Sequence, residues 1–257
     1  MSTPTSVGRA ELLHALDAAL QPQLFKDYGP NGLQVEGRAT ITRLITGVTA
    51  SLALIDAAID AQADAVLVHH GLFWRGQDGR VTGWMKQRLQ RLLAHDINLL
   101  AYHLPLDAHA EWGNNAQLAQ RLGVSVLPGA AGRFGEQSLG WMGTVPATTL
   151  TEWGQRVQAL VQRGITCVGD ANRPIRRVAL CTGGAQSYFE AAIAAGADVF
   201  VTGEISEPQA HYAREMGVAY IACGHHASER YGVQAVGDAM AQQLGIEHQF
   251  IEIDNPA

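Results

Sequence analysis

The chain has 257 residues, the length of one large domain or two small ones. Hydrophobic residues make up 47% and charged residues 16%, a composition that builds a packed core and excludes disordered and fibrous proteins. The net charge of −6 disfavours a nucleic-acid-binding surface, although a local basic patch is compatible with it. No apolar run reaches the roughly 18 residues of a membrane span, and the first residues lack the apolar core of a signal peptide. We therefore expect a cytoplasmic protein that does not enter a membrane.

The cysteines agree with a reducing compartment. Cys167, Cys181 and Cys223 are odd in number and far apart in the sequence, which predicts no disulfide framework. Each lies at the end of an apolar run, so we expect three buried side chains that pack as small hydrophobic groups.

Short apolar runs alternate with helical stretches along the chain, an order typical of an α/β fold. In chain order, helices are predicted over residues 7–20, 52–62, 84–95, 115–122, 150–163, 187–195, 208–215 and 228–244. Strands are predicted over residues 44–48, 65–68, 97–102, 139–145, 178–181, 199–202, 218–223 and 249–253. The strand segments are continuously apolar rather than alternating, which predicts sheets covered by helices on both faces.

An internal repeat is visible at an offset of 134 residues. Segment 41–44 matches segment 175–178, and segment 56–64 matches segment 190–198 at the same offset. Because loop lengths drift between unrelated elements, the shared register favours a duplication; the alternative is that Ala-Ala-Ile-x-Ala is a common helical sequence. A stretch of small residues over 128–135 indicates a connection between the halves. We therefore predict two α/β repeats, residues 1–127 and 128–257.

Histidines and acids follow the strands of the first half. His69 and His70 end one predicted strand, and His103 and Asp107 follow the next. The carboxyl ends of strands in α/β sheets are where ligands bind, so these side chains are candidates for a metal site. The alternatives are that the histidine pair caps a strand through backbone hydrogen bonds and that Asp107 serves a turn in a loop.

The second half contributes a comparable segment, Gly224-His225-His226-Ala227-Ser228-Glu229, after its last long apolar run. His225 and Glu229 are four residues apart, so in a helix they share one face and can hold an ion. Alternatively, Glu229 is an acid favoured by the helix dipole. The remaining histidines of both segments, His103 and His226, are candidates for proton transfer or for orienting the metal ligands. His14, His95, His109, His211 and His248 are expected to be ordinary surface residues.

Nitrogen and oxygen ligands without thiolate favour Zn, Mn, Fe or Co. Two such ions, about 3.5–4 Å apart, would supply hydroxide near neutral pH and polarise a substrate oxygen. Residues 181–185, Cys-Thr-Gly-Gly-Ala, could present backbone N–H groups to an anion, but a tight strand-to-helix turn is the favoured interpretation.

Together these segments resemble the dinuclear metal-centre family known as GTP cyclohydrolase 1 type 2, which includes YbgI-like proteins and is related to the yeast NGG-interacting factor. The motifs that carry the resemblance are His69-His70-Gly71, the segment from His103 to Asp107, Thr202-Gly203-Glu204, residues 224–232, and Asn31-Gly32-Leu33-Gln34-Val35-Glu36-Gly37. The resemblance covers nearly the whole chain. It implies two intertwined α/β repeats, a homohexameric toroid, and two divalent metal ions per chain held by His69, His70, Asp107, His225 and Glu229. It also implies a loop near the site for Asn31–Gly37 and, by its alignment with His70, a position near the site for Glu204.

The activity that the resemblance implies is hydrolytic opening of the guanine ring of GTP by metal-bound hydroxide, with release of formate. The same centre would also suit phosphoester or amide hydrolysis. Two functions therefore stay open. One is a dinuclear metal-dependent hydrolase that acts on a nucleotide or related heterocycle, with His103 or His226 moving protons. The other is a non-catalytic metal-binding ring that serves as a scaffold for protein or nucleic acid.

Overall fold

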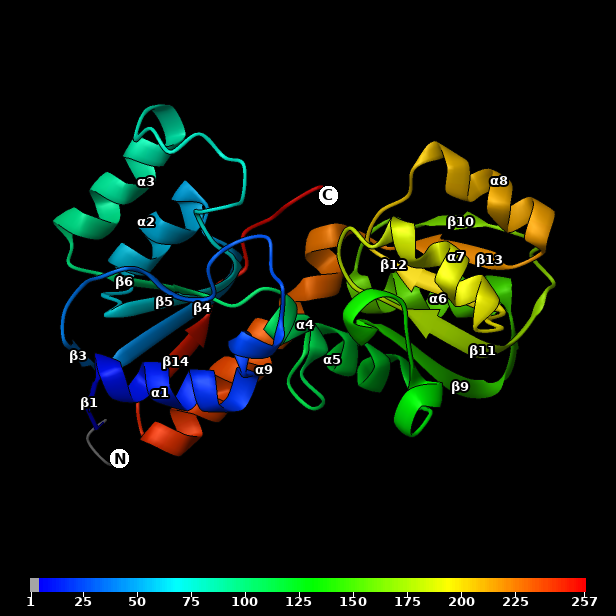
Figure 1. The fold of residues 1–257 in the computed structure, drawn as a ribbon, viewed down its shortest axis with the longest axis horizontal. Helices are drawn as coiled ribbons and strands as arrows, with labels where there is room; N and C mark the ends of the chain where they lie inside the picture. The colour runs from blue at the N-terminus through cyan, green and yellow to red at the C-terminus, as the bar shows by residue number, and fades with distance from the viewer. Residues whose placement is uncertain (1–4) are drawn as a thin grey trace. The chain divides into compact units, whose positions relative to one another are not determined.

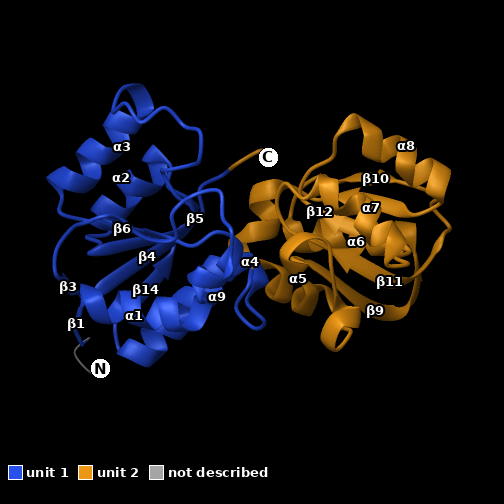
Figure 2. Ribbon diagram, viewed as in Figure 1, with its two compact units in different colours: residues 1–113, 232–254 blue, residues 114–231, 255–257 orange. Residues whose placement is uncertain are grey.

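Mixed β-sheets covered by helices form the fold in the computed structural model, which describes residues 5–257 (Figure 1). The chain divides into two units, each built from discontinuous segments (Figure 2). Unit 1 consists of residues 1–113 and 232–254, and unit 2 consists of residues 114–231 and 255–257. Among the described residues, no helix has both the length and the apolar character that crossing a membrane requires. The α/β class expected from the alternation of helices and strands is confirmed.

Unit 1 is organised around a sheet with the strand order β14-β4-β5-β6-β2. The four strands β14, β4, β5 and β6 are parallel, and β2 runs antiparallel to β6. Its elements are β1 (Val7–Gly8), α1 (Arg9–Leu20), η1 (Pro22–Leu24), β2 (Gly32–Val35), β3 (Thr40–Ile41), β4 (Arg43–Thr49), α2 (Leu52–Asp60), β5 (Ala65–His70), α3 (Gly83–Ala94), β6 (Asn98–Ala101), α4 (Leu104–Ala108) and β14 (Glu247–Phe250).

Alternate residues of these strands enter cores on opposite faces of the sheet, as the continuous apolar runs predict. Leu67 of β5 packs with residues of α1 and α9 (His225–Leu244), and its neighbours Val66 and Val68 pack with residues of α2 and α3. Figure 1 shows α2 and α3 on one side of this sheet and α1 and the latter part of α9 on the other. The strand ends are therefore the part of the sheet that the helices leave available for a site.

Unit 2 contains a sheet with the order β10-β13-β12-β11-β9-β7, and β8 pairs with β9. Strands β11, β12 and β13 are parallel, whereas β9 and β10 run antiparallel to their neighbours. Its elements before α9 are α5 (Asn114–Leu122), β7 (Ser125–Val126), η2 (Gly129–Gly132), β8 (Arg133–Phe134), η3 (Glu136–Ser138), β9 (Gly140–Thr149), α6 (Leu150–Val161), β10 (Thr166–Val168), β11 (Pro174–Leu180), η4 (Gln186–Tyr188), α7 (Phe189–Ala194), β12 (Val199–Thr202), α8 (Glu207–Met216) and β13 (Ala219–Ala222).

The predicted repeat has a structural counterpart in the pairing of the strands. In unit 1, Leu44 of β4 pairs with Ala65 of β5, and in unit 2, Val178 of β11 pairs with Val199 of β12. Both residues of the second pair lie 134 positions after those of the first. The two units thus use the same β-α-β arrangement in the same register.

One aspartate fixes this arrangement in each unit. In unit 1, Asp64 Oδ2 accepts hydrogen bonds from the backbone N–H groups of residues 42 and 43, at 2.7 and 2.9 Å. In unit 2, Asp198 Oδ2 accepts hydrogen bonds from those of residues 176 and 177, both at 2.8 Å. Each carboxylate therefore ties the start of one strand to the start of the next. The sequence match at Asp64 and Asp198 reflects this shared hydrogen-bonding role.

The bounds of the units differ from those of the predicted repeats, residues 1–127 and 128–257. Helix α5 belongs to unit 2 because Leu118 and Leu122 pack in its core, and α9 enters unit 1 at Gly232, where Val236 and Met240 pack. Packing defines the units, whereas sequence similarity defines the repeats. The unit bounds therefore do not test the division into two repeats, which stays a prediction.

Some local predictions need correction. Asp107 lies in the short helix α4 rather than in a loop, and the last strand is Glu247–Phe250 instead of residues 249–253. Cys181 and Cys223 are buried as expected, but Cys167 is exposed on β10. The short strands β1, β2, β3, β7, β8 and β10 were not predicted; most of them have only two or three residues, too few to show a periodicity.

Candidate metal-binding clusters

Three histidines come together at the carboxyl ends of β5 and β6 in unit 1. His69 and His70 are the last residues of β5, with ring centroids 4.5 Å apart. The ring of His103, which follows β6, lies 4.9 Å from that of His69 and 5.7 Å from that of His70. One ring nitrogen of each histidine lies within 4.8 Å of the others, a spacing that a single metal ion can bridge. His103, expected only to transfer protons or to orient ligands, therefore also fits the role of a ligand.

Hydrogen bonds at the Nδ1 atoms orient these imidazoles. Nδ1 of His69 contacts the Tyr102 carbonyl oxygen at 3.1 Å, and Nδ1 of His70 contacts the Thr49 hydroxyl at 3.2 Å. Because a carbonyl oxygen only accepts, His69 must donate from Nδ1, which makes Nε2 the atom for a metal. That Nε2 lies 3.5 Å from Oδ1 of Asp107, which is buried on α4. Asp107 is thus next to the histidine cluster, as the prediction requires.

His103 is held by a carboxylate that sequence reasoning missed. Oδ1 of Asp27 lies 2.7 Å from Nδ1 of His103, and Oδ2 of Asp27 accepts from the backbone N–H of Leu104 and the side-chain amide of Asn31, both at 2.9 Å. Burial alone would raise the pKa of the Asp27 carboxyl, but the hydrogen bonds from His103, Asn31 and Leu104 hold the pKa below its usual value. An ionised Asp27 fixes the Nδ1–H tautomer of His103 and leaves Nε2 as an acceptor.

Asn31 brings the start of the segment Asn31–Gly37 next to the histidine cluster. Its side-chain oxygen accepts the backbone N–H of His103 at 2.8 Å, while its amide donates to Asp27. Asn31 therefore links the Asp27 carboxylate to the backbone of His103, the residue whose ring Asp27 orients. Residues Gly32–Val35 form strand β2, which pairs with β6, so the middle of the segment Asn31–Gly37 is a strand rather than a loop, and Asn31 directly precedes it.

Unit 2 holds a second cluster at the start of α9. Nε2 of His225 lies 3.2 Å from Oε2 of Glu229, and its Nδ1 lies 2.6 Å from Oε1 of Glu204. Burial lowers the pKa of His225, but the two carboxylates outweigh burial and raise the pKa to about 9. A metal at Nε2 would have to displace a proton that the two acids favour. The i, i+4 pairing of His225 and Glu229 on one helical face is as predicted, and Glu204 is found beside them.

Gly183 makes room for this second cluster. It has a left-handed backbone with φ of +73°, and a Cβ atom at this position would overlap Oε1 of Glu229. The same Cβ would lie 3.2 Å from Nε2 of His225. Only glycine therefore suits both the backbone and the space.

Two backbone amides of this turn already have acceptors within unit 2. The N–H of Thr182 donates to Asn115 at 2.9 Å, and that of Gly183 donates to Ser228 at 3.0 Å. The turn interpretation of residues 181–185 is therefore favoured over an anion-binding loop, because two of its donors bind side chains of the unit itself.

The other histidines are more varied than expected. His226 is buried, with 8% of its surface exposed, and as the residue after His225 it points about 100° away around the helix. Its predicted role in proton transfer stays a prediction. His248 is not a surface residue: only 6% of its side chain is exposed, and its nitrogens contact Asp238 and Thr46.

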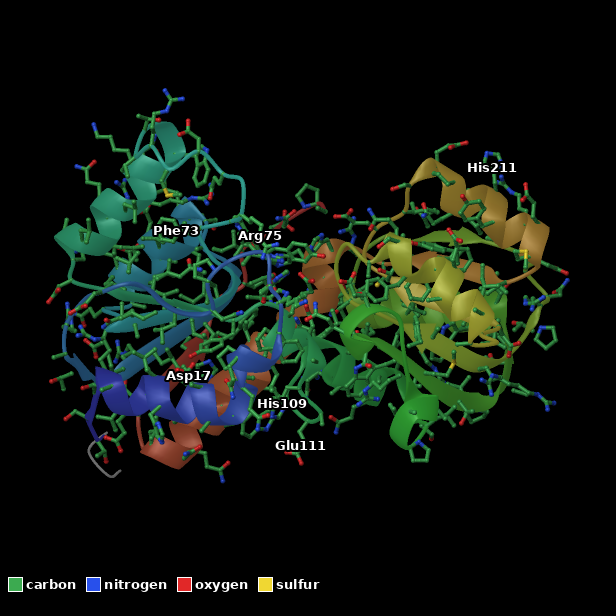
Figure 3. All side chains as sticks on the ribbon, in the orientation of Figure 1. Asp17, Phe73, Arg75, His109, Glu111 and His211 are labelled. Atoms are coloured by element: carbon green, nitrogen blue, oxygen red, sulfur yellow. The ribbon has the colours of Figure 1, made fainter. Side chains whose placement is uncertain are left out.

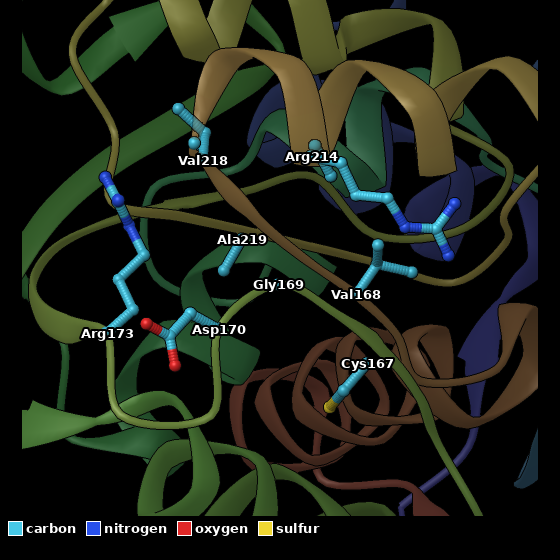
Figure 4. A pocket seen from close by; sticks show the side chains of 10 residues that line it. Cys167, Val168, Gly169, Asp170, Arg173, Arg214, Val218 and Ala219 are labelled. Carbon is cyan, nitrogen blue, oxygen red and sulfur yellow. The ribbon is translucent and has the colours of Figure 1, made fainter.

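A separate cavity of about 420 Å³ lies in unit 2 beside β10 and contains none of the predicted site residues (Figure 4). Two of its charged side chains bind neighbouring backbone groups: Arg173 donates from Nε to the Asp198 carbonyl, and Asp170 accepts the N–H of Asn172. In Figure 4 the guanidinium groups of Arg173 and Arg214 point in different directions. The groups do not converge on a common point, so the histidine and carboxylate clusters remain the candidate sites.

Comparisons with known proteins agree with the resemblance noted in the sequence. A curated relative from Neisseria meningitidis serogroup A, a GTP cyclohydrolase 1 type 2 homolog, is 50% identical over 250 residues, which is 97% of this chain and 99% of the relative. A relative of the same name from Pseudomonas aeruginosa is 49% identical over 253 residues, covering 98% of this chain and 100% of the relative.

Solved structures show the same fold. The protein ybgI, of unknown function, has a TM-score of 0.93 at 43% identity, covering 98% of this chain and 100% of that chain. TTHA1606 from Thermus thermophilus has a TM-score of 0.86 at 32% identity, with the same coverage. The family model described as Duf34/NIF3 (NGG1p interacting factor 3) matches residues 7–256. The chain therefore belongs to the Duf34/NIF3 family.

Proposed function

We propose that the chain is a hydrolase that depends on two divalent metal ions and acts on a nucleotide or a related heterocycle. The proposed ligands are His69, His70 and Asp107 of unit 1 and His225 and Glu229 of unit 2. The observation that carries the proposal is the histidine cluster of unit 1, in which three ring nitrogens lie within 4.8 Å of one another. The names of the curated relatives support the nucleotide as the class of substrate.

The chemistry of the donors fits divalent ions such as Zn, Mn, Fe or Co. Imidazole and carboxylate suit these metals, and thiolates are not part of either cluster. When bound, such ions polarise a substrate oxygen and lower the pKa of water toward neutrality.

The residues of the chain would position the metal and move protons. Asp27 holds His103 with a proton on Nδ1, so Nε2 can either bind metal or accept a proton. Glu204 holds His225 in the same way from the Nδ1 side. Carboxylate–histidine pairs of this kind fix the orientation of the ring and raise its basicity. His226 is the alternative proton carrier.

Formate release from GTP tests the proposal. We expect Mn- or Zn-loaded protein to release formate, and Asp107→Asn to lose both this activity and part of its metal while keeping its fold. Metal content measured by elemental analysis should also fall in Glu229→Gln. Unchanged metal stoichiometry in both variants would contradict the ligand assignment.

Well-metallated protein that releases no formate would discard GTP ring opening. A screen of phosphoester and amide substrates would then separate another hydrolase from the alternative function, a non-catalytic metal-binding ring that serves as a scaffold. The cytoplasmic location and the homohexamer stay predictions, and the hexamer is tested by the mass of the assembly in solution.

A further inference from the structure

A pocket in unit 1 borders the histidine cluster, and its lining includes the aromatic residues Tyr28, Phe73 and Trp74. Its volume is about 340 Å³, and it is formed by the segments 27–30 and 73–75. The second segment follows β5, the strand that ends in His69 and His70; Figure 3 labels Phe73 and Arg75 on it. A cavity of this size suits a small organic ligand.

Two aromatic rings of the pocket, those of Trp74 and Tyr28, lie beside the histidine cluster. The ring of Trp74 lies 5.1 Å from that of His103, nearly perpendicular to it at 88°, and 6.0 Å from that of His70. Tyr28 lies 6.0 Å from His103 and keeps 58% of its surface exposed. A large aromatic side chain with this exposure contributes little to a core, and exposed apolar rings beside a polar cluster are typical of binding sites.

The two segments are fixed to each other before any ligand binds. The backbone N–H of Arg75 donates to the Tyr28 carbonyl at 2.6 Å, and the Arg75 guanidinium donates from one terminal nitrogen to the Asp27 carbonyl at 2.8 Å. Their close approach depends on Gly29, because a Cβ atom there would overlap the carbonyl oxygen of Phe73. A pocket built in advance loses little entropy when a ligand binds.

We propose that this pocket binds the planar ring of an aromatic heterocycle, which stacks on Tyr28 and Trp74, and that Arg75 binds an anionic group carried by the same molecule. The inference rests on the proposed function in that the heterocycle is the substrate of the adjacent cluster. Aromatic faces bind bases of any sequence by stacking, and a guanidinium pairs well with phosphate or carboxylate. Tyr28, Trp74 and Arg75 would therefore determine the substrate class, while the metal ligands perform the reaction.

Equilibrium dialysis of the metal-loaded protein with guanosine, with GTP and with inorganic triphosphate separates the two contacts. Tyr28→Ala should weaken binding of guanosine and of GTP by roughly 5- to 150-fold, whereas Tyr28→Phe should bind both as the wild type does, because the ring is retained. Arg75→Gln should weaken binding of GTP and triphosphate by about tenfold and leave guanosine unaffected.

Matched controls lie elsewhere on the surface of unit 1. Trp84, which is 50% exposed on α3, and Arg80, whose side chain is 81% exposed, can be changed to Ala and Gln without touching the pocket. Metal content and melting temperature are measured for every variant. The proposal is contradicted if Trp84→Ala loses as much binding as Tyr28→Ala, or if Tyr28→Ala binds guanosine as the wild type does.

The pocket and the hydrolase can fail separately. Ligand binding with the expected variant pattern but without formate release supports the pocket and counts against GTP hydrolysis. Formate release with an unchanged KM in Tyr28→Ala and Arg75→Gln supports the hydrolase and overturns the pocket. Wild-type protein that binds none of the three probes also overturns it.

Discussion

Residues 134 positions apart play equivalent structural roles in the two units, yet the side chains at the strand ends differ. His70 of unit 1 corresponds to Glu204 of unit 2, and Thr49 corresponds to Gly183. Thr49 bonds the His70 ring in unit 1, whereas Gly183 leaves space for Glu229 in unit 2. The same β-α-β scaffold thus carries an imidazole-rich cluster in one unit and a carboxylate-rich cluster in the other.

The scaffold and the strand ends are therefore under different constraints. The aspartates that tie the strands together, Asp64 and Asp198, are the same in both units because backbone N–H groups must be satisfied in each. The strand ends bear no such common requirement. One feature is nonetheless shared: a carboxylate at Nδ1 orients one histidine in each unit, Asp27 for His103 and Glu204 for His225.

Gly183→Thr, which gives unit 2 the residue found in unit 1, should have the largest effect. The Thr side chain would overlap Glu229 and require a left-handed backbone, so we expect destabilisation by about 2–4 kcal/mol and loss of metal binding at His225. Urea unfolding and metal titration measure the two effects. Gly164→Ala is the control, because a Cβ atom there meets no atom within 4 Å. Equal stability of the two variants would show that the positions are not under different constraints.

Asp27→Asn should come next. The buried carboxylate accepts from His103, Leu104, Asn31 and the backbone N–H of Tyr28, and an amide cannot accept all four. We expect a loss of about 1–3 kcal/mol in the free energy of unfolding, and metal affinity lower by about 10- to 100-fold. Denaturant unfolding of the metal-free protein isolates the first effect. A variant with wild-type stability and affinity would contradict the role assigned to Asp27.

Sequence reasoning recovered the scaffold because its signals are local and repeated. The apolar runs at β4, β5 and β12 and the spacing of Asp64 and Asp198 are visible without a structure. The role of Asp27 was not, because it lies 76 residues before His103 in a segment without periodicity. A single acid in a loop carries no pattern that predicts its partner.

The candidate metal ligands show the same difference between local sequence signals and contacts made by distant residues. His69, His70 and the pair His225–Glu229 were found from strand ends and helical spacing, signals that act over a few residues. The contact of His103 with the other two imidazoles required the register of β5 and β6, which the sequence does not specify. Short elements such as α4 are stabilised by tertiary packing and therefore leave a weak signal.

Removing the shared aspartates tests whether the two units are equally dependent on them. Asp64→Ala and Asp198→Ala each leave two backbone N–H groups without an acceptor, at a cost of about 1–2 kcal/mol. Asp64 also contacts Arg38 at 2.9 Å and is 9% exposed, so its replacement should be the more destabilising of the two. Urea unfolding of both variants gives the comparison. A larger effect at Asp198 would show that the shared hydrogen bonds do not dominate.

Glu204→Gln should have the smallest effect on stability, because 42% of its side chain is exposed and solvent screens its pairing with His225. We expect a change below about 1 kcal/mol, in contrast to Asp27→Asn. Metal affinity should nevertheless fall by about tenfold, because a neutral glutamine beside Nδ1 makes Nε2 of His225 a less basic metal ligand. Metal titrations of Glu204→Gln, alone and combined with Asp27→Asn, measure this loss of affinity. A stability loss in Glu204→Gln as large as that in Asp27→Asn would mean that burial does not distinguish the two orienting carboxylates, and that the clusters differ in composition alone.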